Sequence, residues 1–178
     1  MAKEIEVKVL NVNLDEMEKR LIKIGAKLLS KEYQVNTIFD SEDNYIEDRL
    51  NSYLRIRETQ NLLTQEKNIN LTLKKNISKE GARKNIEVTT PIKDKESMIY
   101  ILKELKYNII QEGYKDRTSY IYENIRFDLD KWDKPTYSYP YMEIEVEKEE
   151  DLEKAINLLK IDRKNISTKS IIELKKEL

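Results

Sequence analysis

Residues 4–12 read EIEVKVLNV, a segment in which apolar and charged side chains alternate. The apolar side chains share one face of an extended chain, whereas Glu4, Glu6 and Lys8 share the other face. Such alternation predicts a β-strand with one apolar and one charged side. The same pattern recurs as YLRIRE at 53–58, LTLKK at 71–75, NIEVT at 85–89, YKDRTSY at 114–120, RFDLDK at 126–131 and YMEIEVE at 141–147. Two-sided strands therefore dominate the chain.

Four segments follow the helical period instead, at about 14–24, 94–106, 149–160 and from about 168. Asn13 can cap the first of these helices, and Gly25 stands where it should end. The side chains expected to face inward from the second helix are Met98, Ile101, Leu102 and Leu105. Many antiparallel-looking strands with a few peripheral helices predict an α+β fold with a large sheet or a closed barrel. The chain has no Pro/Ser-rich linker, so we expect one domain over residues 1–178.

The composition excludes several kinds of chemistry. The chain contains no His and no Cys, which removes Ser-His-Asp and Cys-His catalysis, His/Cys metal sites and disulfides. Its three glycines are far apart, so there is no Gly-rich phosphate-binding loop. Charged residues make up 38% of the chain but the net charge is only -1, which argues against a nucleic-acid coat. No apolar run approaches the roughly 18 residues of a membrane span, and we expect a cytoplasmic protein without a membrane partner.

The charged faces of the strands are sorted by sign. Some strands carry pairs of acids and others carry pairs of bases, whereas an ordinary solvated strand face mixes the two signs. If these faces point into a closed barrel, the interior is wet and needs counter-ions, because unpaired buried charges are unfavourable by several kcal/mol each. Carboxylates without His or Cys suit Mg²⁺ or Mn²⁺, and clustered Arg and Lys suit a multiply charged phosphate. This combination is typical of phosphoryl transfer.

The ordered series of motifs resembles the CYTH superfamily, also called triphosphate tunnel metalloenzymes. The series runs EIEVK, TIFD, YLRIR, LTLK, NIEV, YKDR, DLD, EIEVE and TKSIIEL, and it spans residues 4–174. The superfamily includes class IV adenylate cyclases, thiamine triphosphatases, inorganic triphosphatases and, more distantly, fungal RNA triphosphatases. The resemblance implies a closed eight-stranded antiparallel β-barrel, a tunnel open at both ends, with peripheral helices outside it.

The resemblance also implies roles for individual residues. The residues implied to bind Mg²⁺ or Mn²⁺ are Glu4, Glu6, Asp130, Glu143 and Glu145. Those implied to hold the triphosphate are Lys8, Arg55, Arg57, Lys74, Lys115, Arg117 and Lys169. Lys8 and Glu87 are the implied catalytic residues, Glu87 by orienting basic neighbours or the attacking water. Family members often have a basic residue near position 83, and here both Arg83 and Lys84 qualify.

Three functions are compatible with these residues. The first is metal-dependent hydrolysis of an inorganic or organic triphosphate, which we favour because no adenine-binding pattern is visible. The second is a class IV adenylate cyclase that converts ATP to cyclic AMP and pyrophosphate. The third is a non-catalytic triphosphate-binding module, which the complete set of acids argues against. The expected partner is a small-molecule triphosphate, with a homodimer left open.

One segment departs from the family pattern. Many members have a Leu-Gly pair shortly before the Glu-Ile-Glu, but residues 131–145 here read KWDKPTYSYPYMEIE. Trp132 in this segment is either a packing residue, which we favour, or a stacking platform at the tunnel mouth. Asp128 shares a strand face with Asp130, and we expect it to pair with Arg126 or another base.

Overall fold

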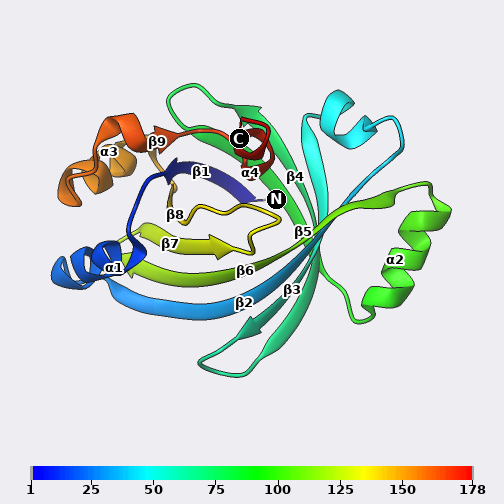
Figure 1. Cartoon of the computed structure of the whole chain (residues 1–178), viewed down its shortest axis with the longest axis horizontal. Helices are drawn as coiled ribbons and strands as arrows, with labels where there is room; N and C mark the ends of the chain where they lie inside the picture. Colours follow the sequence, from blue (N-terminus) through cyan, green and yellow to red (C-terminus); the bar gives the residue numbers. More distant parts are fainter. Residues whose placement is uncertain (1, 178) are drawn as a thin grey trace.

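A closed antiparallel β-barrel forms the centre of the computed structural model, which describes residues 2–177 (Figure 1). Eight strands occur in the order β5-β4-β3-β2-β6-β7-β8-β1, and β1 also pairs with β5, which closes the sheet. The strands are β1 (Ala2–Val9), β2 (Lys27–Asp40), β3 (Ser52–Asn61), β4 (Lys67–Ser78), β5 (Arg83–Pro91), β6 (Asn108–Tyr122), β7 (Ile125–Trp132) and β8 (Tyr141–Val146). The predicted closed eight-stranded barrel is thus confirmed.

Strand β1 is where the barrel closes. Its first half pairs with β5, with Glu6 opposite Arg83, and its second half pairs with β8, with Lys8 opposite Glu143. A ninth strand that the sequence did not predict, β9 (Ile166–Ser167), continues the free edge of β1 beyond the end of β5. Every part of β1 therefore has a hydrogen-bonded neighbour, and this fixes its charged face toward the interior.

The helices lie outside the barrel. They are α1 (Leu14–Lys23), α2 (Lys95–Glu104), α3 (Glu149–Leu158), α4 (Ile171–Lys175) and the short 3-10 helix η2 (Arg163–Asn165). Helix α1 begins as predicted, because the Asn13 side chain accepts a hydrogen bond from the Glu16 N–H. It ends as predicted at Gly25, whose φ of +86° is the left-handed conformation that glycine tolerates best. No helix within residues 2–177 has the length and apolar character to cross a membrane.

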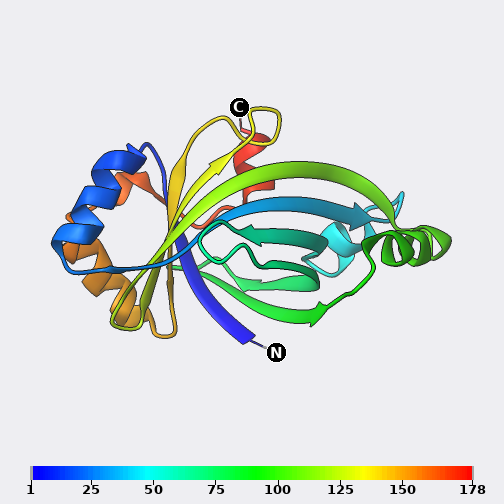
Figure 2. The same cartoon turned by 90° about the horizontal axis from the view of Figure 1, so that it is seen from below.

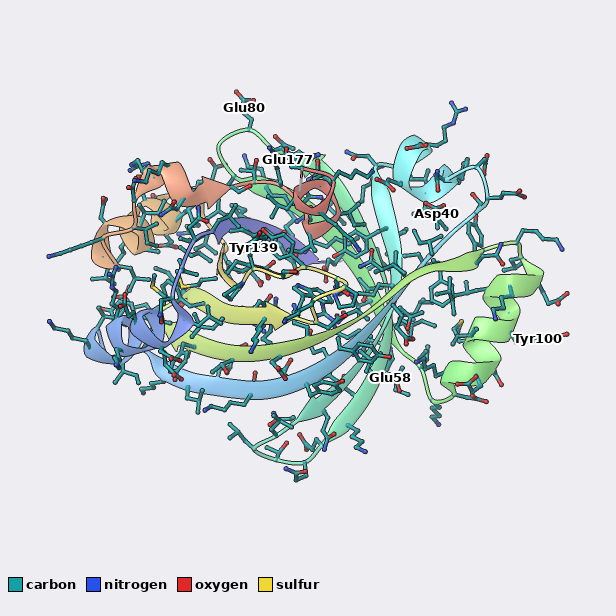
Figure 3. The ribbon with its side chains drawn as sticks, viewed as in Figure 1. Asp40, Glu58, Glu80, Tyr100, Tyr139 and Glu177 are labelled. Carbon is teal, nitrogen blue, oxygen red and sulfur yellow. The ribbon has the colours of Figure 1, made fainter. Side chains whose placement is uncertain are left out.

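A π-helical turn, η1 (Tyr45–Arg49), follows β2 and was not predicted. Asp40, at the end of β2, accepts hydrogen bonds from the backbone N–H groups of Ser41, Ile46 and Glu47. Its buried carboxylate therefore holds the turn against the end of the barrel, where Figure 3 labels it. Asp40 lies in the Phe-Asp of the TIFD motif, so this part of the motif has a structural role in positioning η1.

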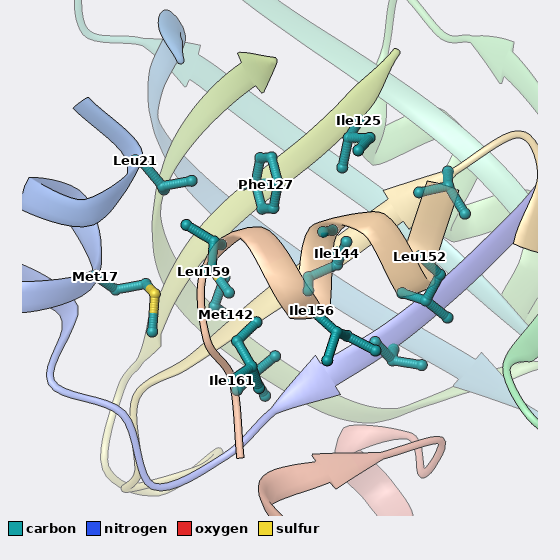
Figure 4. Close-up of a cluster of buried hydrophobic side chains, with 14 of the residues drawn as sticks. Met17, Leu21, Ile125, Phe127, Met142, Ile144, Leu152, Ile156, Leu159 and Ile161 are labelled. Atoms are coloured by element: carbon teal, nitrogen blue, oxygen red, sulfur yellow. The ribbon is translucent and has the colours of Figure 1, made fainter. Parts of the chain in front are cut away.

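The main apolar core lies outside the barrel wall, between the strands and two helices. Helices α1 and α3 pack over β7, β8 and β1 (Figure 4). Leu21 of α1, Phe127 of β7, Ile144 of β8 and Ala155 of α3 are each completely buried there. Because successive side chains of a strand point to opposite faces, burying the apolar face outward turns Asp128 and Glu143 inward.

Helix α2 lies beyond the opposite end of the barrel from α1 and α3 (Figure 2). Its Leu102 is buried and Met98 packs beside it, as predicted. The prediction for Ile101 and Leu105 was wrong, since these side chains are 49% and 62% exposed. The buried stripe runs through Met98, Ile99 and Leu102 instead, because this helix is only ten residues long and presents one narrow face to Phe39 and Ile56.

Candidate active site

The inward faces of the strands enclose a cavity of about 410 Å³. Eleven of the thirteen predicted site residues line it, namely Glu4, Glu6, Lys8, Arg55, Arg57, Lys74, Glu87, Lys115, Arg117, Glu143 and Glu145. They come from six of the eight barrel strands, β2 and β7 being the exceptions, and from positions as far apart in the sequence as 4 and 145. Asp130 and Lys169 are the two predicted residues outside this lining.

Carboxylates gather around Lys74 on one side of the cavity. Its Nζ lies 2.5 Å from Glu4, 3.1 Å from Glu87 and 3.5 Å from Glu6. Burial disfavours the charged ammonium, but Tyr53 and these carboxylates outweigh it and raise the pKa of Lys74 well above its usual value. Burial likewise opposes ionisation of Glu87, yet the charges of Lys74 and Arg55 lower the pKa of Glu87. Lys74 thus serves as the resident cation of an acidic cluster.

Glu145 belongs to the same acidic side of the cavity, but it forms no ion pair with a described Lys or Arg. It stands opposite Glu6 in the β1–β8 register, and no ion pair forms at it within residues 2–177. Burial and the nearby charge of Glu4 raise the pKa of Glu145 to about 7. Burial, together with the charges of Glu87 and Glu6, also raises the pKa of Glu4 despite its contact with Lys74. The cluster therefore holds more negative charge than one ammonium neutralises.

This acidic cluster has the donor chemistry that a divalent cation requires. Glu4, Glu6 and Glu145 offer only oxygen atoms, which are the ligands that Mg²⁺ and Mn²⁺ prefer. Glu4, Glu6 and Glu87 gather around the single ammonium of Lys74, so a further cation would be attracted there. No three acidic side chains within residues 2–177 form a preassembled metal cluster, since Lys74 separates Glu4 from Glu87 and Glu6. The residues fit such an ion, provided that Lys74 turns away.

Two guanidinium groups from β3 form a cationic part of the cavity. Arg55 and Arg57 lie two residues apart on the inner face of β3, and neither forms an ion pair with a carboxylate of residues 2–177. The buried Nε of Arg55 has no hydrogen-bond partner, and the Nε of Arg57 donates to Asn36 Oδ1 at 2.7 Å. Burial and the charges of Arg55 and Arg117 lower the pKa of Arg57 to about 9. These two bases are therefore cations without counter-ions.

Arg117 and Lys115 are bases that the protein itself neutralises. Arg117 donates to Asp130 at 2.7 and 2.5 Å and to Glu143 at 2.6 Å, and it lies 2.7 Å from Asp128. Burial disfavours its charge, but the three acids raise its pKa well above the usual value. Lys115 Nζ donates to Asp130 at 2.9 Å, yet burial and the charge of Arg117 lower the pKa of Lys115 to about 7.

Asp130 is placed differently from the other acids that were predicted to bind metal. It is completely buried behind the cavity wall, and its two oxygens are already bonded to Lys115 and Arg117. This position makes it an anchor for two bases. Asp128, behind the same wall, pairs with Arg126 at 2.8 Å and with Arg117, as the sequence suggested.

Lys8 and Glu143 form a buried pair that crosses from β1 to β8. Lys8 Nζ lies 3.0 Å from a Glu143 oxygen, while Arg117 donates to the other oxygen. Burial disfavours ionisation of Glu143, but Lys8 and Arg117 outweigh it and hold the pKa of this carboxyl well below its usual range. Glu143 therefore stays ionised and holds both bases at the cavity surface.

The structure distinguishes the two basic neighbours in β5. Arg83 lines the cavity and lies 3.8 Å from Glu6 and 3.1 Å from Glu173, whereas Lys84 points outside and pairs with Glu149. Lys169 is not brought to the cavity either, since its ammonium pairs with Glu177 next to α4.

Several lining residues were missed or undecided in the sequence. The cavity is also lined by Arg126, Asn36 and Glu173. Of these, Arg126 could have been found from the sequence, because it lies on the same strand face as the two acids of the DLD motif. Trp132 donates from its indole N–H to the Tyr141 hydroxyl at 2.8 Å and lies under Lys115 Nζ, 5.1 Å from the ring centre. These contacts agree with the packing role that we favoured for it.

A closed antiparallel barrel with sorted acids and bases inside defines the class of triphosphate tunnel proteins. The CYTH domain model matches residues 2–173, so the chain belongs to the CYTH domain family. The chain is similar in structure to PH1819 from Pyrococcus horikoshii OT3, with a TM-score of 0.79 and 21% identity over 98% of both chains. A comparison with curated protein sequences finds no match.

Two further structures share the fold. A candidate adenylate cyclase from Vibrio parahaemolyticus has a TM-score of 0.76 and 16% identity, with 97% of each chain covered. The Hippeastrum adenylyl cyclase candidate HpAC1, for which a dominant triphosphatase activity is described, has a TM-score of 0.66 and 15% identity, with 96% of this chain and 91% of that chain covered. CYTH proteins are typically triphosphatases or adenylate cyclases, and they generally depend on a divalent metal ion.

Proposed function

We propose that this protein binds a triphosphate inside its barrel and, with Mg²⁺ or Mn²⁺, hydrolyses a phosphoanhydride bond. The observation that carries the proposal is the pair of uncompensated cations, Arg55 and Arg57, in the same cavity as a cluster of acids. A triphosphate with a divalent cation supplies the missing negative charge to one side and the missing positive charge to the other.

The bases of the barrel bind and orient the phosphate chain. Arg55 has a buried Nε–H without a partner, and the planar fork of a guanidinium group matches two oxygens of one phosphate. Lys115 and Arg117 are held in place from behind by Asp130, so they approach the phosphates without side-chain rearrangement. Such preorganised charge is the main source of rate in phosphoryl transfer.

The acids of the barrel serve the attacking water and the metal ion. Glu4, Glu6 and Glu145 would hold Mg²⁺ or Mn²⁺, which when bound neutralises phosphate charge and polarises the P–O bonds. Glu87, kept ionised by Lys74 and Arg55, accepts the proton of a water whose oxygen forms a bond to the terminal phosphorus. The bridging P–O bond breaks, and its oxygen leaves with the electron pair toward Lys8.

The proposal is tested by incubating the purified protein with tripolyphosphate, ATP or thiamine triphosphate and with Mg²⁺ or Mn²⁺. Products are identified by ³¹P NMR and chromatography. Orthophosphate together with a shortened phosphate chain is the expected result. Cyclic AMP and pyrophosphate from ATP would instead establish an adenylate cyclase, and the absence of turnover with measurable binding would establish a non-catalytic module.

Two matched variants test whether Glu87 takes part in catalysis. Glu87→Gln keeps the shape of the side chain but removes the proton acceptor, and we expect turnover to fall by about 10²–10⁴ while tripolyphosphate still binds. Glu147→Gln is the control, because Glu147 is exposed beyond the end of β8 and does not line the cavity. Equal turnover in the two variants would remove Glu87 from the mechanism.

A further inference from the structure

Asn36, on the inner face of β2, has a side-chain amide that is bonded at only one of its two polar atoms. The residue is 2% exposed, lines the cavity and stands directly opposite Arg57 in the β2–β3 register. Its Oδ1 accepts a hydrogen bond from Arg57 Nε at 2.7 Å, whereas its buried Nδ2 has no hydrogen-bond partner within residues 2–177. Such a buried donor is unfavourable to folding, because nothing compensates for its loss of hydration.

The orientation of this amide follows from its neighbours. A guanidinium group has N–H donors and no acceptor, so the Asn36 atom that faces Arg57 Nε must be the oxygen. The NH2 group therefore points away from Arg57 Nε. The neighbour on the other side is Gly113, directly opposite Asn36 in the β2–β6 register, which has no side chain to accept a hydrogen bond. The barrel wall thus leaves this donor unused.

The other two buried asparagines of the described chain use their amide groups inside the protein. Asn85 Nδ2 donates to Glu6 at 3.1 Å, and Asn76 Nδ2 donates to Asn85 Oδ1 at 3.2 Å. Neither of these two residues lines the cavity. Asn36 is therefore distinguished by both its place at the cavity and its unused donor.

Gln34, the next inward residue of β2, provides a matched comparison. It is also 2% exposed, and one of its side-chain atoms has no partner either. That atom is the acceptor Oε1, because Nε2 donates to Glu32 at 2.6 Å, and Gln34 does not line the cavity. An unused acceptor has no bond to offer an ionised phosphate, whereas the unused donor of Asn36 does.

We propose that Asn36 binds the substrate anion directly: its Nδ2 donates to an oxygen of the phosphate that Arg57 holds, while its Oδ1 fixes the Arg57 guanidinium. The bond to Asn36 uses Arg57 Nε, which leaves the two Nη groups for that phosphate. A charged acceptor forms a stronger hydrogen bond than a neutral one, so a phosphate oxygen suits the buried Nδ2. This inference rests on the proposed function, since it adds β2 to the strands that contact the substrate.

A double-mutant cycle separates direct contact from an effect through Arg57. Calorimetric titration with tripolyphosphate, without divalent metal ions so that no turnover occurs, compares the parent protein, Asn36→Leu, Arg57→Met and the double variant. We expect Asn36→Leu to weaken binding in the Arg57→Met background as well, by about tenfold, the lower end for one hydrogen bond to a charged group. Gln34→Leu, the matched control, should leave the Kd unchanged. No further loss in the Arg57→Met background, or an equal loss in Gln34→Leu, would overturn the inference.

A measurement on the parent protein does not depend on the folding of these variants. The Asn36 side-chain amide signal in a ¹H–¹⁵N NMR spectrum is identified by its absence in Asn36→Asp, which keeps the shape of the side chain. Tripolyphosphate should move this amide proton signal downfield, as hydrogen bonding to an anion does, and leave the Gln34 signal in place.

The outcomes distinguish this inference from the proposed hydrolysis. An Asn36 signal that does not move although tripolyphosphate binds would overturn the inference and leave the hydrolysis standing. The expected shift and the expected cycle, without cleavage of any triphosphate by the metal-loaded protein, would support the inference but refute the hydrolysis. A complete lack of tripolyphosphate binding would overturn both.

Discussion

Replacing Arg57 by methionine should stabilise the ligand-free protein. The guanidinium has no carboxylate partner, and burial together with Arg55 and Arg117 lowers its pKa from 12.5 to about 9. At about 1.4 kcal/mol per unit, this shift sets an upper limit of roughly 5 kcal/mol on the unfavourable electrostatic free energy. Loss of the hydrogen bond to Asn36 offsets part of it, so we expect a gain of about 1–2 kcal/mol, the range typical when a strained functional group is removed.

This stabilisation is measured by thermal unfolding without and with tripolyphosphate and Mg²⁺. For a chain of this length, about 1–2 kcal/mol corresponds to roughly 2–8 °C in Tm. Ligand at 100 times its Kd should add about 2.7 kcal/mol to the parent protein and clearly less to Arg57→Met. Arg163→Met, an exposed arginine paired with Glu153, is the control and should change Tm little. A lower Tm for ligand-free Arg57→Met would refute the reasoning.

Three further predictions concern other charged groups. Arg83→Met should weaken tripolyphosphate binding by about 1–3 kcal/mol in calorimetry, whereas Lys84→Met should leave it unchanged, and the reverse order would contradict the placement of these side chains. Tripolyphosphate binding at pH 8 should take up a proton, since burial and Arg117 lower the pKa of Lys115 to about 7 and the bound anion raises it. Titrations in buffers of different ionisation enthalpy detect this uptake, and Lys115→Met should reduce it. The pKa of Glu173 is lowered from 4.5 to about 2, because Lys79 and backbone and side-chain hydrogen bonds at Ser170 outweigh burial. The ionised Glu173 carboxylate therefore contributes fully to stability above pH 4.5, and this contribution is lost as the pH falls through 2. The difference in Tm between the parent protein and Glu173→Gln should disappear as the pH is lowered from 4.5 to 2.

Which side of each strand faces the tunnel is a local property. Side chains alternate with a period of two, so the apolar residues beside Glu4, Arg55 and Glu143 determine which face is buried outside and which lines the cavity. The composition and the sorting of charge by strand also indicate binding of a divalent cation and a phosphate, because the sign of each strand face follows directly from its residues. Together with the resemblance to the CYTH superfamily, which implied the closed barrel, these local patterns allowed eleven of the lining residues to be predicted without coordinates.

Pairing between distant segments is a different matter, because it depends on register and packing across the whole chain. The closure of β1 on β5 brings Arg83 opposite Glu6, whereas Lys84 on the other face of β5 pairs with Glu149 outside. The β6–β7 register places Asp130 opposite Arg117, where its buried carboxylate bonds to Arg117 and Lys115.

The register of β2 against β6 also depends on the tertiary structure. The bulge at Ile110 is an irregularity of pairing that leaves no periodic signal. The sequence by itself determined the faces, the charges and the class of chemistry, because these follow from local alternation. The folded chain decided which charges compensate one another, because those contacts join residues far apart in sequence.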